Sequence, residues 1–338
     1  MLVFPPDILR TEIALPSSKS ISNRALVIRA LSGGDMPIDN VSDCDDSRVV
    51  EEALRLMPRV VDIKAAGTAM RFMTSLLAVL GGDHIITGTD RMQRRPIAVL
   101  VDALRSLGAD ITYMDMEGFP PLRIRGGRLT GGRLALPGNV SSQYISSLLM
   151  IAPTLKDGLV LELTGEVISR PYIDMTLAIM QQFGARAKWS DERTVCVEPV
   201  CYSPIPYYIE SDWSAASYWY EMVALAADPG AEVSLPGLFQ NSLQGDSKVA
   251  ELFSRLGVET RFCDNAVRLV KCSCDDGAFE CNLVEHPDLA QTIVVTCCMM
   301  GKHFRISGLQ TLRIKETDRI AALQKELGKL GFEIGVEG

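Results

Sequence analysis

The feature that most constrains this chain is an internal repeat with a period of about 74 residues. A helix-like stretch that ends in an apolar residue followed by glycine occurs four times. The closing glycines are Gly108, Gly184, Gly257 and Gly331, spaced 76, 73 and 74 residues apart. A fixed period of this length indicates a structural unit that is used repeatedly.

A second motif has the same period. It is a small or polar cap followed by an apolar helix, and its caps are Thr68, Ser141, Asp212 and Asp288, with offsets of 73, 71 and 76 residues. Short β-like segments, many of them closed by glycine, separate the helices. Each unit is therefore predicted to be β-α-β-α-β-β. A shorter copy begins at residues 17–20, with its second helix near residues 45–57.

The repeat predicts an α/β (α+β) chain with two domains. The units are expected at 16–66, 67–140, 141–210, 211–286 and from 287 onward. Residues 16–210 then form a complete domain of three units. Residues 1–15 together with 211–338 form a second domain that is expected to be incomplete, because the sequence ends inside a unit.

Charge and hydropathy exclude several classes of partner. The chain has 34 Lys and Arg against 42 Asp and Glu, a net charge of −8, which argues against nucleic acid. The apolar runs at 145–153 and 289–300 are too short to span a membrane, and the N-terminus lacks the basic start of a signal peptide. We expect a cytoplasmic protein that binds neither nucleic acid nor membrane.

Nine cysteines, an odd number, are typical of reduced thiols rather than a disulfide framework. Cys272, Cys274 and Cys281 come nearest to the spacing of a zinc site, but they have no matching second pair and no nearby histidine. Cys272 and Cys274 would share one face of a strand, and Cys297 lies with Cys298 in an apolar run. We therefore expect small buried side chains and no metal.

The clearest candidate for anion binding is the start of the first helix. In PSSKSISNRAL, residues 16–26, Lys19 and Ser20 open a helix and Arg24 lies one turn further on the same face. A helix N-terminus carries unpaired N–H groups and a partial positive charge, so this combination suits a phosphate or carboxylate. The glycines of a nucleotide P-loop are absent. The alternative is that the serines only cap the helix and the cations are solvated.

Other helix starts carry similar groups. Gly67 permits close approach of a ligand to the backbone, and Arg71 lies one turn inside that helix. Arg91, Arg94 and Arg95 precede a helix predicted to begin with Pro96, and three cations so close together favour a bound anion. The remaining polar helix starts are Ser141-Ser142-Gln143, which suits a polyol phosphate, and Ser169-Arg170-Pro171-Tyr172. Ordinary capping is the alternative at each of these positions.

Acid–base candidates lie in the second half of the chain. Asp288 follows Pro287 at a helix start. The run from Lys315 to Arg319 is expected to occupy one helical turn, so that its two cations share a face and favour an anion between them. Glu316 is suited to proton transfer if partly buried. A solvated helix start is the alternative. The three histidines show no metal pairing, and the spacing gives no sign of a nucleophilic triad.

Eight motifs together resemble one known family. PSSKSISNRAL, AGTAMR, RMQRRP, PPLRI, SSQY, SRPYID, NSLQGD and RIKETDR occur in the order found in 5-enolpyruvylshikimate-3-phosphate synthases, along the whole chain. The resemblance implies a two-domain inside-out α/β barrel, with three units per domain closing on a cleft. It also implies transfer of the enolpyruvyl group of phosphoenolpyruvate to the 5-hydroxyl of shikimate 3-phosphate, with release of phosphate through a tetrahedral intermediate, in aromatic amino acid biosynthesis. No cofactor and a monomeric protein are implied.

The resemblance also implies roles for individual residues. Those implied for shikimate 3-phosphate are Lys19, Ser20, Arg24, Ser141, Ser142, Gln143, Ser169, Tyr172, Asp288 and Lys315. Those implied for phosphoenolpyruvate are Lys19, Gly67, Arg95, Gln143 and Arg319. Asp288 is implied as the base near the 5-hydroxyl, with Glu316 and Lys19 as proton-transfer partners. Positioning and electrostatic clamping of two polyanions would then supply most of the catalysis.

The chain departs from the family pattern at three positions. Ala65 and Phe72 stand where the family commonly has Asn and Pro, and Thr311 stands where it often has Asn, which puts that substrate contact in question. Because Phe72 follows Gly67 in the same helix, we expect an altered fit of phosphonate inhibitors such as glyphosate. An unchanged inhibition constant in Phe72→Pro would contradict this expectation.

A further departure concerns the ending. The family's Asp-His-Arg motif and a late Lys, both of which grip phosphoenolpyruvate, are absent. The sequence therefore predicts a C-terminally truncated chain that binds shikimate 3-phosphate better than it catalyses. Full turnover would contradict that prediction.

Two other functions remain open from the sequence. The sister enolpyruvyl transferase that acts on UDP-N-acetylglucosamine shares the fold but uses a loop cysteine as an acid, and the corresponding loop here, residues 87–96, has none. A catalytically inactive scaffold or ligand-binding fragment of the same fold is the second alternative. Tight retention of ligand without phosphate release would favour it.

Overall fold

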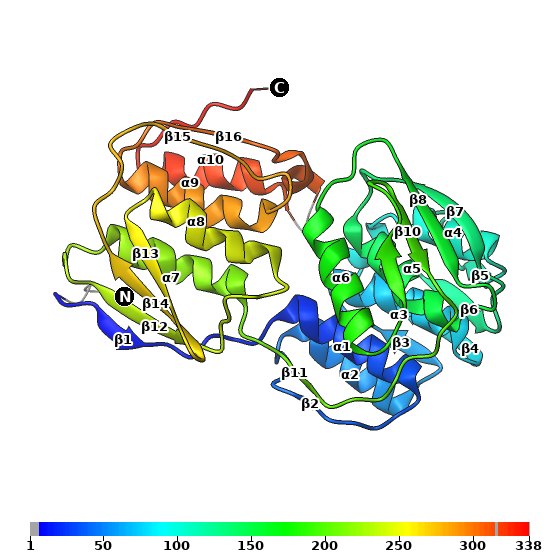
Figure 1. The fold of residues 1–338 in the computed structure, drawn as a ribbon. Coiled ribbons are helices and arrows are strands. Elements are labelled where there is room, and N and C mark those ends of the chain that lie inside the picture. The colour runs from blue at the N-terminus through cyan, green and yellow to red at the C-terminus, as the bar shows by residue number, and fades with distance from the viewer. Residues whose placement is uncertain (1–6, 315–316, 338) are drawn as a thin grey trace. The chain divides into compact units, whose positions relative to one another are not determined.

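A computed structural model describes residues 7–314 and 317–337 (Figure 1). The chain divides into two compact units, unit 1 from residues 1–16 and 210–338 and unit 2 from residues 17–209. The sequence-based boundaries, at 16 and 210, differ from this division by one residue at each crossing. Each unit has its own sheets and helices and is described separately below.

Unit 2 contains three sheets. Its helices are α1 (Lys19–Ser32), α2 (Asp45–Leu56), α3 (Gly67–Val79), α4 (Ala98–Ser106), α5 (Ser142–Ile151) and α6 (Arg170–Gln182). Its strands are β2 (Ile38–Asp39), β3 (Val60–Asp62), β4 (Gly82–Thr87), β5 (Asp110–Tyr113), β6 (Leu122–Gly126), β7 (Gly132–Pro137), β8 (Leu159–Thr164), β9 (Ala187–Trp189), β10 (Thr194–Val197) and β11 (Tyr207–Tyr208). The sheet orders are β3-β4-β6-β5, β7-β8-β10-β9 and β11-β2.

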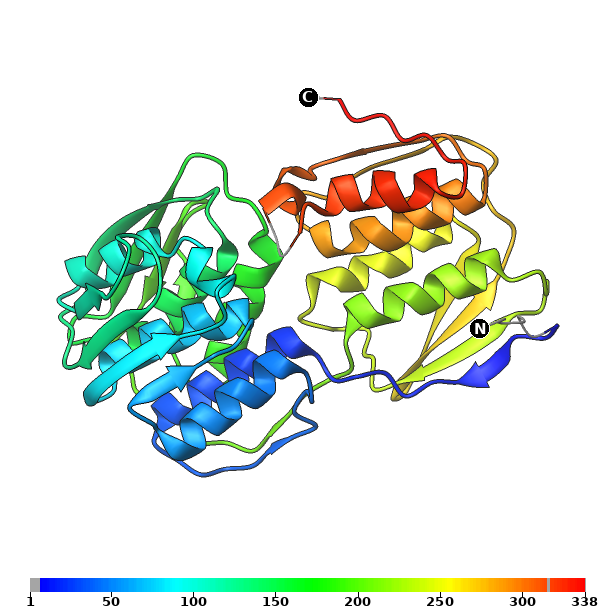
Figure 2. The same cartoon turned by 180° about the vertical axis from the view of Figure 1, so that it is seen from behind.

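Unit 1 repeats the same pattern. Its helices are α7 (Trp213–Leu225), α8 (Val249–Ser254), α9 (Ala290–Met299) and α10 (Arg319–Gly328). Its strands are β1 (Arg10–Glu12), β12 (Glu232–Pro236), β13 (Val258–Cys263), β14 (Ala266–Lys271), β15 (Phe279–Asn282) and β16 (Phe304–Ser307). These strands form the sheets β1-β12-β14-β13 and β15-β16. Figure 2 shows its four helices running side by side.

The predicted β-α-β-α-β-β unit is confirmed. Each four-stranded sheet starts with a parallel pair, and its third and fourth strands are antiparallel neighbours. The predicted limits were wrong, however. The two four-stranded sheets of unit 2 begin with β3 and β7, the strands before α3 and α5, and the four-stranded sheet of unit 1 begins with β1, from the start of the chain. Strands β1 and β3 have only three residues each, too few for a clear alternation of apolar and polar side chains.

The four glycines of the repeat share one backbone conformation. Gly108, Gly184, Gly257 and Gly331 have φ of 102°, 87°, 84° and 89°, in the region that L side chains rarely adopt. They follow the ends of helices α4, α6, α8 and α10, where a left-handed residue redirects the chain out of the helix. At Gly108, Gly184 and Gly257 the glycine therefore marks the point at which the unit turns from its second helix toward its last two strands.

The capping motif is only partly as predicted. Ser141 caps α5 by accepting from the Gln143 N–H at 3.4 Å, and Asp212 caps α7 by accepting from the Ala215 N–H at 2.8 Å. Thr68 is not a cap, because α3 already begins at Gly67. Asp288 lies in a 3₁₀ turn (Pro287–Leu289) ahead of α9 and caps no helix with its side chain.

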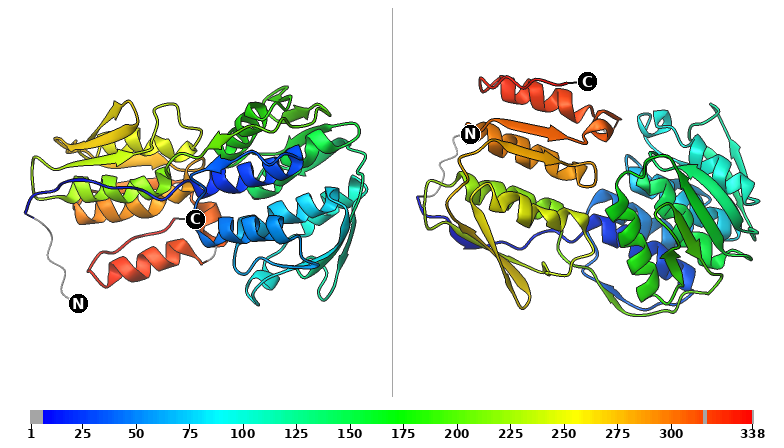
Figure 3. Two further views of the ribbon diagram at one scale, coloured as in Figure 1. Left: turned by 90° about the horizontal axis from the view of Figure 1, so that it is seen from below. Right: turned by 45° about the horizontal axis from the view of Figure 1, so that its top comes forward.

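Helices form the interior of unit 2. Eleven consecutive residues of α3, from Thr68 to Ala78, are buried, as are residues 21–28 of α1 and 144–151 of α5. A helix that is buried on all sides needs neighbours all round it, which explains why these stretches lack an amphipathic pattern. Figure 3 shows the sheets of unit 2 toward the outside and the helices between them, as expected for an inside-out barrel.

The cysteines differ in exposure. Cys297 and Cys298 are buried as predicted, but Cys272 is exposed and Cys274 is half-buried, so the prediction of buried side chains was wrong for this pair. Strand β14 ends at Lys271, before either residue, and they therefore do not share a strand face. Among the described residues, no helix is long and apolar enough to cross a membrane.

Candidate functional site

The N-terminus of α1 presents Lys19 to solvent. Ser18 is fully buried and caps the helix by accepting from the Ile21 N–H at 3.5 Å. Lys19 is the first helical residue and is exposed, and it makes no hydrogen bond or ion pair with any residue that the structure describes. Its ammonium group is therefore available at the positive end of a capped helix.

Arg24 is buried and held on several sides, with only 2% of its surface exposed. Its Nε donates to Thr176 Oγ1 at 2.7 Å, and its Nη1 donates to the Ser20 carbonyl at 2.8 Å. Its Nη2 donates to Ser146 Oγ at 3.1 Å and to the Tyr172 carbonyl at 3.3 Å. Burial lowers the pKa of Arg24 to about 10, so the side chain stays charged at neutral pH.

These contacts limit what Arg24 can offer a ligand. Four of the five guanidinium N–H groups are used by Thr176, Ser20, Ser146 and Tyr172. The fifth is on Nη1, the nitrogen that points to the first turn of α1. The Phe72 ring covers one face of the guanidinium, with its centroid 5.4 Å from Cζ. The geometry therefore leaves Arg24 only one N–H group to offer a ligand, from a guanidinium that is otherwise held in place.

The N-terminus of α3 brings together three predicted residues. The guanidinium of Arg95 lies against Gly67, so close that a Cβ built on Gly67 would be 2.4 Å from Nη1. Gln143 Nε2, in the first turn of α5, donates to Thr68 Oγ1 at 3.2 Å. Gly67, Arg95 and Gln143, which are 28 to 76 residues apart in sequence, therefore surround one helix N-terminus. Thr68 joins this group, a role the sequence did not reveal.

Arg71 and Tyr144 hold the loop that carries Arg95. Arg71 donates to the Gly67 carbonyl at 3.1 Å and to the Pro96 carbonyl at 3.4 Å, and its guanidinium lies 5.7 Å from the Tyr144 ring. Tyr144 OH donates to the same Pro96 carbonyl at 2.6 Å. The prediction that Pro96 opens a helix was wrong, because α4 begins at Ala98 and the Pro96 carbonyl serves as this anchor.

The other arginines of that loop do not join the group. Arg91 and Arg94 are exposed, whereas Arg95 is half-buried, and a 3₁₀ turn from Met92 to Arg94 separates them. Of the three cations predicted to surround an anion, the structure places only Arg95 at the N-terminus of α3.

The predicted residues of α5 and α6 lie at the N-termini of those helices. Ser141 is exposed, while Ser142 and Gln143 are half-buried in the first turn of α5. Ser169 precedes α6, is 8% exposed and has φ of 54°, in the left-handed region that is uncommon for residues other than glycine. Ser169 is the N-cap residue of α6, but its side chain makes no capping hydrogen bond to the helix.

Side-chain hydrogen bonds join the N-terminal halves of four helices in unit 2. Arg24 connects α1 to the first turn of α6 through the Tyr172 carbonyl, and Gln143 connects α5 to α3 through Thr68. Thr176 Oγ1 donates to Ser146 Oγ at 2.8 Å and so connects α6 to α5. Four helix N-termini, with Lys19 and Arg95 among them, make this region strongly suited to anions.

In unit 1 the structure pairs two predicted residues. Arg319 Nη1 donates to Asp288 Oδ1 at 2.9 Å. Gln291 lies in the first turn of α9, and its hydrogen-bond partners assign the orientation of its amide. In that orientation the nitrogen lies 3.0 Å from the Asp288 carbonyl and the oxygen 2.9 Å from Arg319 Nη1. Lys315 and Glu316 lie outside the described residues. For the described residues 317–319 the predicted helical turn was wrong, because α10 begins only at Arg319, with Asp318 as its cap.

The positions that depart from the family pattern differ in their surroundings. Phe72 is fully buried within α3 beneath Arg24, whereas Ala65 is exposed. The hydroxyl of Thr311 is buried and has no hydrogen-bond partner among the described residues. Phe72 is therefore the departure with a direct structural connection to a predicted substrate residue.

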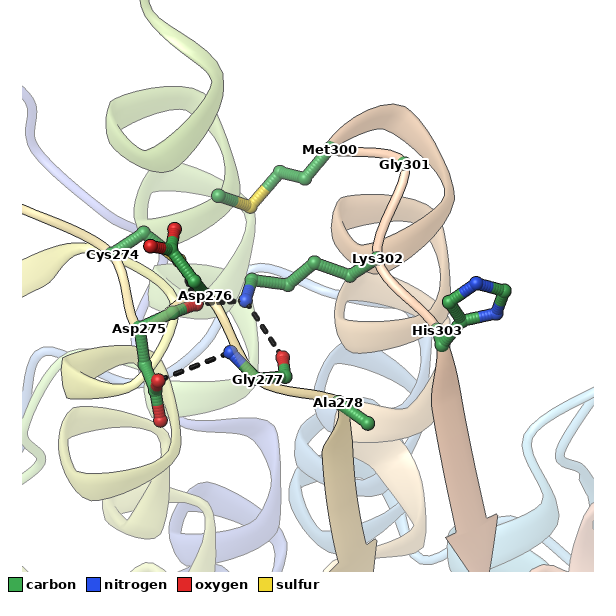
Figure 4. A pocket seen from close by; sticks show the side chains of 9 residues that line it. All are labelled: Cys274, Asp275, Asp276, Gly277, Ala278, Met300, Gly301, Lys302 and His303. Carbon is green, nitrogen blue, oxygen red and sulfur yellow. Dashed lines mark hydrogen bonds between the residues drawn. The ribbon is translucent and has the colours of Figure 1, made fainter.

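Unit 1 contains a pocket of about 320 Å³ that is lined by none of the predicted substrate or catalytic residues. It is formed by the loop 274–278 and the turn 300–303 (Figure 4). Lys302 Nζ crosses it and donates to the carbonyls of Asp275 and Gly277. No group of three or more potential metal ligands occurs in the described part of the chain. We therefore interpret this region as a loop that Lys302 holds in place by two hydrogen bonds, and not as a binding site.

Comparisons with known proteins agree on one family. The family model for EPSP synthase (3-phosphoshikimate 1-carboxyvinyltransferase) matches residues 3–60 and 56–338. A protein of Bacteroides fragilis strain YCH46 named 3-phosphoshikimate 1-carboxyvinyltransferase is 55% identical over 331 residues, covering 98% of this chain and 80% of the relative. A Vibrio cholerae protein of the same name is 36% identical over 358 residues, covering 98% of this chain and 83% of the relative.

A solved structure supports the fold. The EPSP synthase of Acinetobacter baumannii superimposes with a TM-score of 0.75 at 19% identity, covering 96% of this chain and 79% of that chain. The chain thus spans about four fifths of the length of the relatives named here, and these comparisons do not support the predicted truncation.

Proposed function

The chain belongs to the EPSP synthase family, and we propose that it transfers the enolpyruvyl group of phosphoenolpyruvate to the 5-hydroxyl of shikimate 3-phosphate, releasing phosphate. The observation that carries this proposal is the hydrogen-bonded joining of the N-terminal halves of four helices in unit 2, with Lys19 at the N-terminus of α1 and Arg95 at that of α3. It supports binding of polyanions, and the 55% identical relative is named for this reaction.

Shikimate 3-phosphate would be held mainly by residues of unit 2. In this proposal Lys19 and Ser20 bind at the α1 N-terminus, and Arg24 adds the single N–H that its other contacts leave. Lining residues from the starts of α5 and α6 are Ser141, Ser142, Gln143, Ser169 and Tyr172. Because the hydrogen bonds of Arg24 and Gln143 already fix these helix starts, little reorganisation would accompany binding.

Phosphoenolpyruvate would be bound by groups that overlap with this set. Lys19, Gly67, Arg95 and Gln143 serve it in unit 2, and Arg319 serves it in unit 1. The bare backbone of Gly67 matters here, because it lets the Arg95 guanidinium reach the α3 N-terminus. A guanidinium beside helix N–H groups is a strong partner for carboxylate or phosphate.

The chemistry would use acid and base groups. Asp288 takes the proton of the 5-hydroxyl while the hydroxyl oxygen bonds to C2 of phosphoenolpyruvate. At the same time C3 gains a proton and becomes a methyl group. Loss of a methyl proton then restores the double bond as the C2–O bond to phosphate breaks. Lys19 and Glu316 are the proposed partners for the protons at C3, and Lys315 a further contact of shikimate 3-phosphate.

The proposal is tested by phosphate release from the purified chain. We expect release when phosphoenolpyruvate and shikimate 3-phosphate are both present, and none with either alone or with UDP-N-acetylglucosamine as the acceptor. Release with the nucleotide sugar would favour the sister transferase. Tight binding of shikimate 3-phosphate without any phosphate release would favour the inactive binding protein.

Gly67→Ala should weaken phosphoenolpyruvate binding selectively. The new Cβ would be 2.4 Å from Arg95 Nη1, which forces the guanidinium away from the α3 N-terminus. We expect KM for phosphoenolpyruvate to rise at least about tenfold, the cost of one charge-assisted hydrogen bond, with the dissociation constant of shikimate 3-phosphate within twofold.

The matched control is Gly81→Ala, just beyond the other end of α3. A Cβ on Gly81 meets no atom within 4 Å. Its KM values should equal those of the unsubstituted protein. An unchanged KM for phosphoenolpyruvate in Gly67→Ala would show that Arg95 does not bind this substrate.

A further inference from the structure

We propose that Gln291 is a positioning residue that keeps Arg319 oriented for phosphoenolpyruvate when Asp288 turns to its own substrate. This inference rests on the function proposed above. Gln291 belongs to no motif that the sequence analysis singled out. Its place in unit 1 connects three segments, the 3₁₀ turn before α9, the first turn of α9 and the start of α10.

The argument begins with the hydrogen bonds of Arg319. Arg319 Nη1 lies 2.9 Å from Asp288 Oδ1, and it lies 2.9 Å from the Gln291 oxygen when the orientation of that amide is assigned from its hydrogen-bond partners. The amide nitrogen of Gln291 donates to the Asp288 carbonyl at 3.0 Å, which fixes the direction of its oxygen. Gln291 therefore holds the guanidinium by a contact that is independent of the Asp288 side chain.

Asp288 and Gln291, both of which contact Arg319, differ in charge, and this difference matters for the reaction. In the ion pair, Asp288 and Arg319 neutralise each other, yet each is proposed to act on a different substrate. An anion that binds Arg319 competes with Asp288 for the guanidinium. A hydroxyl that binds Asp288 draws the Asp288 carboxylate away from Arg319. When this pair separates, the neutral oxygen of Gln291 still orients Arg319 without reducing its attraction for an anion.

The packing of α9 does not need the Gln291 side chain. The helix is anchored by Ile293, Val294 and Cys297, all buried in the core of unit 1, whereas Gln291 is only half-buried. Replacement of Gln291 should therefore leave the fold intact. Its effect should appear in the kinetics.

The test uses two variants, one with a neutral side chain and one with a negatively charged side chain. Gln291→Leu removes the acceptor at similar volume, and Gln291→Glu keeps an acceptor but adds a negative charge. Phosphate release by the full chain is measured against the concentration of each substrate and against pH. In Gln291→Leu we expect KM for phosphoenolpyruvate to rise five- to twentyfold, with kcat and KM for shikimate 3-phosphate within twofold.

Gln291→Glu separates an electrostatic role from a merely structural one. Its carboxylate near Asp288 disfavours a second negative charge, so the acidic limb of the pH profile of kcat/KM should shift to higher pH. KM for phosphoenolpyruvate should also rise, because the added carboxylate competes for Arg319. The matched control is Gln324→Leu on α10, whose amide donates to the Ile334 carbonyl at 2.9 Å and touches no ion pair. It should behave as the unsubstituted protein.

Three results would overturn the inference. The first is an unchanged KM for phosphoenolpyruvate in Gln291→Leu, and the second is an unshifted pH profile in Gln291→Glu. The third is failure of the unsubstituted chain to release phosphate with both substrates, which would overturn the proposed function and this inference with it. Failure confined to the Gln291 variants would leave the proposed function standing.

Discussion

Asp288→Asn should lower the kcat of enolpyruvyl transfer by about 100- to 10,000-fold, the usual contribution of a positioned general base. Asparagine keeps the shape of the side chain and an oxygen that can accept from Arg319 Nη1. In the unsubstituted protein this nitrogen lies 2.9 Å from Asp288 Oδ1. It cannot take a proton from the 5-hydroxyl. The dissociation constant of shikimate 3-phosphate should therefore change only a few-fold, and the loss should appear in kcat measured by phosphate release.

A second acid–arginine pair in unit 1 provides the control. Glu232 lies 3.3 Å from Arg268 on the sheet formed by β12 and β14, and neither residue is proposed to touch a substrate. Glu232→Gln removes a carboxylate charge in the same way and should leave kcat within threefold. A kcat for Asp288→Asn equal to that of this control would show that Asp288 is not the base.

Arg24→Met should destabilise unit 2 strongly and abolish binding of shikimate 3-phosphate. Methionine fills much of the buried volume, but it supplies none of the four hydrogen bonds to Thr176, Ser146 and the two carbonyls. Leaving buried acceptors without a donor costs about 1–3 kcal/mol each at most, and some of these oxygens keep another partner. We expect a loss of about 2–4 kcal/mol, seen as a lower urea midpoint by circular dichroism.

Arg29→Met is the matched control, because Arg29 lies in the last turn of the same helix and is half-exposed. Its removal should cost no more than about 1 kcal/mol of helix-end electrostatics. Equal urea midpoints for the two variants would show that the buried network around Arg24 contributes little to stability.

Local signals made much of the fold predictable. The glycines of the repeat need a left-handed backbone, so they leave a trace in the sequence. The caps Ser141 and Asp212 satisfy helix N–H groups and leave such a trace in two of the units. The short strands β1 and β3, which open two of the four-stranded sheets, left no such trace. With three residues each, β1 and β3 are defined by their neighbours β12 and β4 rather than by their own pattern.

The site was predictable in its residue types but not in their environments. The sequence placed Arg24 on an open helix face, whereas the structure buries it beside Thr176 and Ser146, which are 152 and 122 residues away. Contacts between residues so distant leave no periodic signal. Two serines in the apolar run 145–153 were the available hint, because a hydroxyl inside a buried helix needs a partner.

Some partners left no signal at all. Thr68 was expected to cap a helix and instead receives a hydrogen bond from Gln143. Gln291 resembles any polar residue in the first turn of a helix, and only the position of Arg319 from another segment gives it a role. Such positioning residues depend on tertiary packing, which the sequence pattern does not encode locally.

The central claim is that the α1 N-terminus of this chain binds shikimate 3-phosphate, and Lys19→Ala tests it most directly. Lys19 is exposed and has no hydrogen-bond or ion-pair partner among the described residues, so its removal should leave the fold unchanged. Lys188→Ala, which removes an exposed lysine on β9 of the same unit, controls for the loss of one positive charge.

The measurement is a calorimetric titration of shikimate 3-phosphate into the three proteins. We expect micromolar binding by the unsubstituted chain and by Lys188→Ala, and binding about 10- to 150-fold weaker by Lys19→Ala, equivalent to the loss of a hydrogen bond between charged groups. Equal affinity in all three proteins, or no binding by the folded unsubstituted chain, would contradict the claim.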